Sequence, residues 1–129
     1  MMKRQLFPIT TAADGSATVG QSQTTAQSAI IGKLEAIKYM PGTIATGATV
    51  TVTCVAGDGS EKPLLTQANA GTANLWKYPR DLVHGVTDGA ALTGTNGGDR
   101  TCPLVDGQIK IVIASGGNGG VGSVTVYYE

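Results

Sequence analysis

Residues 48–56, ATVTVTCVA, decide the class of fold that this sequence predicts. Apolar and polar side chains alternate along the segment, with Val50, Val52 and Cys54 on one side of an extended chain and Thr49, Thr51 and Thr53 on the other. Alternation with a period of two is typical of a strand that has one face in a core and the other in water. Residues 57–60, Gly-Asp-Gly-Ser, then supply a tight turn. The segment therefore predicts a half-buried strand.

Further segments have the composition of short strands bounded by turns. They are residues 30–40, 63–68, 73–78, 108–114 and 121–128. A helix is the alternative for the first of them, but that segment lacks an N-cap pattern and Pro41-Gly42 ends it sharply. Short strands at this spacing, without a convincing amphipathic helix, predict an all-β fold: an antiparallel β-sandwich, either jelly-roll or immunoglobulin-like.

The glycine-rich segment 116–122 contains Gly117, Gly119 and Gly122 at the spacing of a dinucleotide-binding loop. That motif binds a pyrophosphate only where it joins a strand to a helix whose first amides face the ligand. Here the residues that follow, Ser-Val-Thr-Val-Tyr-Tyr, favour a strand instead. We therefore expect no bound cofactor, and we predict that the last two strands form a hairpin through residues 116–122.

Composition limits the classes of function. The 129 residues suit one domain, and nine Lys plus Arg balance nine Asp plus Glu, so no nucleic-acid or anionic-membrane partner is expected. No apolar run is long enough to span a membrane, and the basic start lacks the apolar region of a signal peptide. We divide the chain into an N-terminal arm with a polar linker (residues 1–28) and a sandwich body (residues 29–129).

The first eleven residues allow two interpretations. In one, an extended arm attaches the protein to a partner: apolar side chains enter its surface and basic ones meet acidic groups. The residues proposed for this contact are Lys3, Arg4, Leu6, Phe7 and Ile9. In the other, residues 6–10 form an edge strand of the protein's own sandwich, where Pro8 is tolerated because an edge position does not need its amide.

His84 is the only histidine, and Asp81 and Asp88 lie near it in the long glycine-rich segment 81–102. A general base needs a positioned nucleophile and a site that excludes water, and such a segment supplies neither. One histidine with scattered carboxylates also matches no metal-ligand spacing. We therefore expect no enzyme, no catalytic residue and no metal site, and we interpret the segment as a binding surface because of its length.

The two cysteines, Cys54 and Cys102, belong to no C-x-x-C pair. Cys54 shares a strand face with Val50 and Val52, which favours a small buried apolar residue. A disulfide between the two cysteines is the alternative.

Trp76, Tyr78 and Arg80 are of the residue types that are enriched at the centres of protein interfaces. Trp76 and Tyr78 fall on the same face of a predicted strand. Trp76 is interpreted either as the central core residue of a small sandwich or as part of an exposed contact with a partner, together with Tyr78 and Arg80.

Several stretches together resemble a known group of proteins. They are MKRQLFPITT (residues 2–11), LLTQAN (64–69), LWKYPR (75–80), PLVD (103–106) and QIKIVIASGG (108–117). These stretches are similar to small structural proteins of tailed bacteriophages, including capsid decoration or cement proteins. The likeness covers most of the chain, but its motifs are structural and include no catalytic residue.

The resemblance implies a non-enzymatic virion protein, assembled in the host bacterial cytoplasm, that binds and stabilises the head. The major capsid protein would be its partner, and it could also self-associate into a homo-oligomer. A tail or head–tail joining component is one alternative. Another is a carbohydrate-binding adhesin module, in which Trp76, Tyr78, Tyr127 and Tyr128 would stack on sugars.

Overall fold

The computed structural model describes residues 1–20, 30–82 and 100–129, and over these ranges the protein is all-β with no helix. The strands are β1 (Lys3–Thr10), β2 (Ala17–Gly20), β3 (Ile30–Met40), β4 (Thr49–Val55), β5 (Glu61–Gln67), β6 (Leu75–Lys77), β7 (Asp81–Leu82), β8 (Arg100–Thr101), β9 (Leu104–Ala114) and β10 (Val121–Tyr128). All of the pairings are antiparallel. The predicted fold class is confirmed.

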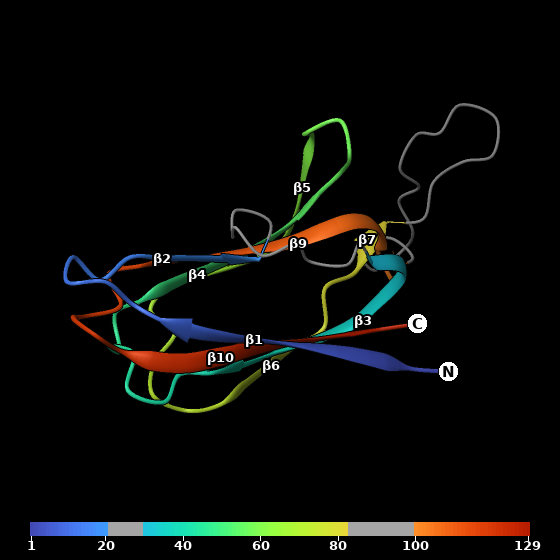
Figure 1. Ribbon diagram of the computed structural model, residues 1–129. Helices are drawn as coiled ribbons and strands as arrows, with labels where there is room; N and C mark the ends of the chain where they lie inside the picture. The colour runs from blue at the N-terminus through green and yellow to red at the C-terminus, as the bar shows by residue number, and fades with distance from the viewer. Residues whose placement is uncertain (21–29, 83–99) are drawn as a thin grey trace, which may run out of the picture.

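The main sheet folds over on itself into two layers (Figure 1). One layer contains β1, β10, β3 and β6, and the other contains β2, β9, β4 and β5. Strand β3 joins them, because its residues 30–33 pair with residues 104–107 of β9 whereas its later residues pair with β10 and β6. The sandwich is therefore closed on one side by a strand that belongs to both layers. Strands β7 and β8 form a separate small sheet.

The core lies between the layers and follows from the alternation in the strands. In β4, Val50, Val52 and Cys54 are buried, as predicted, while the threonines between them face outward. The other fully buried large side chains include Ile9, Leu34, Ile37, Tyr39, Ile109, Ile111, Ile113 and Val124. Burying an aliphatic side chain of this size stabilises the folded state by about 1.5–3 kcal/mol, so these positions dominate the stability of the sandwich.

The N-terminal residues form the edge strand β1 rather than a free arm. All eight residues of β1 pair with β10, from Lys3 opposite Tyr128 to Thr10 opposite Val121. Phe7 and Ile9 face inward and belong to the core, with 6% and 1% of their surfaces exposed. The second interpretation of this segment is thus the one that the structure shows. Residues 21–29, which complete the predicted linker, lie outside the described residues.

The predicted terminal hairpin is wrong. β9 pairs with β2, β3 and β4, whereas β10 pairs with β1 and β3, so the segment between them crosses from one layer to the other. Both sides of β9 already carry other strands, which leaves no edge for β10. Backbone hydrogen bonds fix the crossing segment: the Gly116 N–H donates to Gly15 O (2.8 Å) and the Ala45 N–H donates to Gly116 O (2.9 Å).

Candidate functional site

The outward side of the β1–β10–β3–β6 layer can be built from the strand registers, because residues directly opposite each other in an antiparallel pair share a face. One row crosses all four strands, from Leu6 through Thr125 and Lys38 to Trp76. The neighbouring rows are Arg4–Tyr127–Ala36, Pro8–Ser123–Met40 and Thr10–Val121. We call the residues of these four rows the aromatic face.

Large apolar side chains remain accessible on the aromatic face. Leu6 is 60% exposed, Val121 54%, Trp76 46% and Met40 38%. Each comes from a different strand, so exposed apolar side chains occur across the width of the layer. Single exposed apolar residues are ordinary on protein surfaces, but several on one face are typical of an interaction surface.

Trp76 contacts two other side chains of this face. Its ring stacks on that of Tyr127, with the centroids 5.3 Å apart and the planes at 30°. The Lys38 ammonium lies over the indole, 5.1 Å from the ring centroid. Such aromatic and cation–π contacts each stabilise by about 0.5–1.5 kcal/mol, so the three side chains hold one another in place. The interpretation of Trp76 as a core residue is wrong, because the side chain is exposed; its contact with a partner stays a prediction.

The opposite outer surface of the sandwich has a different chemistry. The row that crosses β2, β9, β4 and β5 is Thr18–Val112–Thr51–Thr66. Small hydroxyl side chains are typical of a strand face that contacts water. The two layers thus share one core but present different outer faces, and the aromatic rings are confined to one of them.

The structure separates the interface residues proposed for the N-terminal segment. Arg4 and Leu6 lie on the aromatic face. Phe7 and Ile9 do not, because they are core residues and cannot reach a partner without unfolding the edge of the sandwich. Lys3 is exposed at the start of β1, opposite Tyr128 and out of phase with the aromatic face.

Tyr78 and Arg80 follow the end of β6. Tyr78 is exposed beside the aromatic face, and the Arg80 guanidinium donates hydrogen bonds to the backbone oxygens of Glu35 (3.0 Å) and Pro79 (2.7 Å). Arg80 therefore fixes the chain after β6.

The sequence analysis did not single out Lys38, Met40 or Val121 as surface residues of the site. Met40 could have been found, because it follows the buried Tyr39 and so points outward from its strand.

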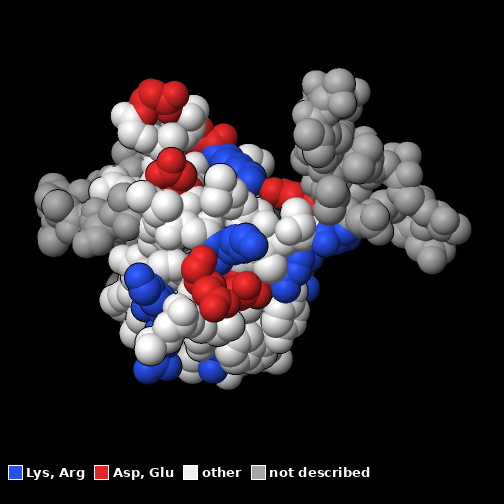
Figure 2. Space-filling view, turned by 90° about the vertical axis from the view of Figure 1, so that its right-hand side faces the viewer, with Lys and Arg blue, Asp and Glu red and all other residues white. Residues whose placement is uncertain are grey.

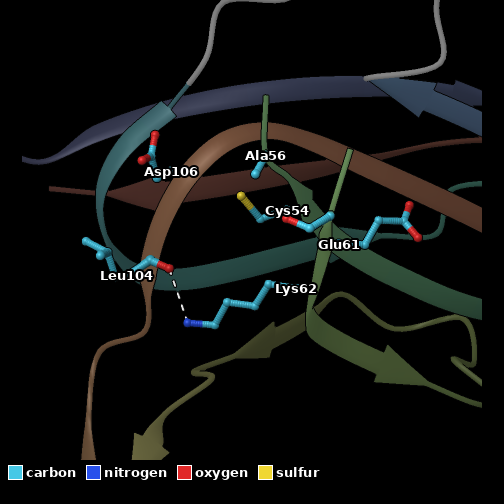
Figure 3. Close-up of a pocket in the computed structure, with 7 residues that line it drawn as sticks. Cys54, Ala56, Glu61, Lys62, Leu104 and Asp106 are labelled. Atoms are coloured by element: carbon cyan, nitrogen blue, oxygen red, sulfur yellow. Dashed lines mark hydrogen bonds between the residues drawn. The ribbon is translucent and has the colours of Figure 1, made fainter. Parts of the chain in front are cut away.

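A cavity of about 290 Å³ lies between the β4–β5 turn and the start of β9 (Figure 3). Its lining residues are Cys54, Ala56, Ser60, Glu61, Lys62, Leu104 and Asp106. The Lys62 ammonium donates hydrogen bonds to Asp81 Oδ2 (2.9 Å) and to Leu104 O (3.2 Å), so beside the cavity it links β5 to β7 and to the start of β9. The cavity thus holds a thiol and separate charged groups, but no residue in its lining pairs with the thiol as a base.

Cys54 and Cys102 are both free thiols, so the alternative of a disulfide is wrong. Cys54 is buried, as expected for a small apolar residue, and its sulfur points into the cavity (Figure 3). The Cys102 thiol is 3.5 Å from Glu35 Oε2, at the base of the small β7–β8 sheet.

Within the described ranges, no group of three or more His, Cys, Asp or Glu side chains is placed to hold a metal ion. His84 and Asp88 lie outside these ranges, so the dyad considered from the sequence stays untested. No helix in the described part of the chain is long and apolar enough to cross a membrane.

No protein-family model matches the chain, and a search of curated proteins gives no significant match. The class of this protein is therefore described from its fold and its surface alone. The protein is an all-β sandwich with one threonine-rich outer face and one aromatic outer face.

Proposed function

We propose that this chain is a non-enzymatic structural protein of a bacteriophage virion: a capsid decoration or cement protein that binds the assembled head through its aromatic face. The observation that carries the proposal is that face, where exposed Leu6, Met40, Val121 and Trp76 cross four paired strands. The resemblance of several stretches to small phage structural proteins supports the same class. The major capsid protein is the partner, and the virion is the location.

A decoration protein stabilises the head because it binds the assembled shell and not its dissociated subunits, which shifts the equilibrium by mass action. A paired sheet suits this role, since its backbone is ordered before contact and little entropy is lost on binding. Strand spacing and rise give the aromatic face an area of roughly 500 Å², against about 800 Å² per partner in a standard interface. We therefore expect the contact to continue onto exposed neighbours such as Tyr78 and Met2.

The adhesin alternative finds less support in the geometry. A sugar needs a free aromatic ring, but Trp76 already carries the Tyr127 ring and the Lys38 ammonium. Tyr128 is one residue out of phase with Tyr127 and packs against the core. Of the four proposed stacking residues, Trp76 and Tyr127 thus stack on each other and Tyr128 packs against the core.

The proposal is tested on purified phage particles. Mass spectrometry should find the protein in the virion, and immunogold labelling should place it on the head. Heads from a strain that lacks the gene should release DNA at a lower temperature than wild-type heads. Absence from the particles would refute a virion role, and labelling confined to the tail would favour the tail or head–tail component. Glycan-array binding that is lost in a folded Trp76→Ala variant would favour the adhesin.

A further inference from the structure

We infer that the aromatic face binds a protein surface that presents carboxylates around an apolar patch, and that it does not bind a second copy of this chain. The inference deepens the proposed function, on which it rests for the identity of the partner. It follows from the charges of the face, from their relation to the apolar residues and from the symmetry of self-association.

The first step is the sign of the charges. Of the residues that form the aromatic face, only Arg4 and Lys38 are charged, and both are cationic. The ion pairs found among the described residues join the N-terminus to Glu129, Lys62 to Asp81 and Lys110 to Glu61, so none neutralises the face. Figure 2 views the end of the sandwich that carries both termini. The charged side chains along its lower edge, on the side of the β1 layer, are Lys and Arg, with Asp and Glu above them.

The second step is the placement of these cations among the apolar residues. Arg4 lies in the row next to Leu6, and Lys38 lies between Thr125 and Trp76 in the row of Leu6 itself. A partner that covers Leu6 and Trp76 therefore removes water from both cations. A buried cation without a partner is costly, whereas a carboxylate opposite it gives a strong contact and fixes the register of docking. The partner must supply those carboxylates.

The third step excludes a second copy. Two identical faces that meet about a two-fold axis place the same set of residues on both sides. Such a contact would remove water from Arg4 and Lys38 of both copies and would offer no carboxylate to any of these cations, which is unfavourable. A nucleic acid also carries negative charge, but two cations on a mainly apolar surface do not form the basic patch that such polyanions require.

The first experiment uses heads purified from a phage strain in which the gene for this protein is deleted. Leu6→Glu should weaken binding to these heads about 30-fold or more, and Arg4→Glu about tenfold or more. Two matched controls should stay within about twofold. Thr66→Glu adds a carboxylate to the exposed edge strand of the threonine-rich face, and Lys33→Glu changes net charge as Arg4→Glu does but lies outside the aromatic face. Circular dichroism should show that all four variants are folded.

The second experiment needs no phage. A synthetic peptide of alternating Glu and Leu is titrated into the labelled protein and followed by nuclear magnetic resonance. Amide shifts should map to β1, β10, β3 and β6, weaken with added salt, and be absent with the Lys-Leu counterpart. Shifts elsewhere, no shifts, or equal shifts with a short DNA duplex would overturn the inference. So would a concentration-dependent dimer that sedimentation detects in the wild type and not in Leu6→Glu.

The two experiments separate the possible failures. If wild-type protein and the Leu6→Glu and Arg4→Glu variants bind heads equally well, the inference is wrong and the aromatic face is not the binding surface, while the role of the protein as a head-binding virion protein stands. If heads bind none of them while the acidic peptide maps to the aromatic face, the proposed function is wrong and the inference stands.

Discussion

Replacement of Gly42 by alanine should destabilise the sandwich strongly although it adds only one methyl group. Gly42 follows β3 and has a φ of +53°, a conformation that costs a residue with a side chain about 1–2 kcal/mol. A Cβ at this position would also overlap the backbone oxygen of Val121, at the start of β10. That oxygen is fixed by the Thr43 N–H, which donates to it at 2.9 Å, so it cannot move aside without losing the hydrogen bond. Overpacking of this kind costs about 1–3 kcal/mol, which gives a total of about 2–5 kcal/mol.

Two other glycines divide this cost into its parts. Gly59 has a φ of +87°, and no atom lies within 4 Å of the position that a Cβ would take, so Gly59→Ala carries the backbone cost alone. Gly47 has no positive φ and is equally open, so Gly47→Ala should be neutral or slightly stabilising. Urea unfolding followed by far-UV circular dichroism gives the three free energies of unfolding. Equal decreases in the free energy of unfolding of Gly42→Ala and Gly59→Ala would refute the reasoning, because the overlap with Val121 would then add nothing to the destabilisation.

Three further changes probe other parts of the structure. Thr11→Val removes the buried hydroxyl that accepts a hydrogen bond from the Gly120 N–H at 2.7 Å, so it should lower the free energy of unfolding by about 1–3 kcal/mol. Thr11→Ser keeps a hydroxyl and should retain most of the wild-type free energy of unfolding. Urea unfolding compares the two variants. Ile111→Ala, at a fully buried position of β9, should cost about 2–5 kcal/mol in the same assay, and a loss below about 1 kcal/mol would contradict the assignment of the core. Hydrogen bonds from the Ser60 hydroxyl and N–H hold the pKa of Asp58 below its ordinary value of 3.8. A carboxyl with a lowered folded pKa stabilises the protein above its unfolded pKa and loses that effect as the pH falls through the folded pKa. Stability should therefore decline on acidification below about pH 4, and less steeply in Asp58→Asn; identical pH profiles would refute this.

The strands themselves could be predicted from the sequence because their signal is local. The alternation in β4 places its residues in the core, and the predicted bounds of β3 and β10 coincide with those of the structure. β9 begins four residues earlier than predicted, at Leu104. Its first residues include Asp106 and Gly107, which are unfavourable in strands, and they are extended because they pair with the start of β3. No local sequence pattern predicts the pairing between the start of β9 and the start of β3.

The arrangement of the strands, and with it the candidate surface, could not be predicted in the same way. A short glycine-rich connection favours a hairpin, but whether one forms depends on which strand edges are free, and those of β9 are occupied by distant segments. Likewise, Leu6 and Trp76 are seventy residues apart in the sequence and share a row only because β10 and β3 lie between them. Residue types suggested contact residues, but only the register shows which of them form one surface.

The place of β10 has a consequence for how this protein is made. β10 lies between β1 and β3, yet it is the last strand of the sandwich to leave the ribosome. Until then β1 has no strand to pair with over its eight residues, and Phe7 and Ile9 remain in water. The sandwich thus cannot close before β10 has been synthesised, and until then the nascent chain exposes the apolar side chains of β1. Loss of residues 121–128 would therefore leave β1 unpaired and available to other chains, a recognised route to aggregation rather than to a smaller folded protein.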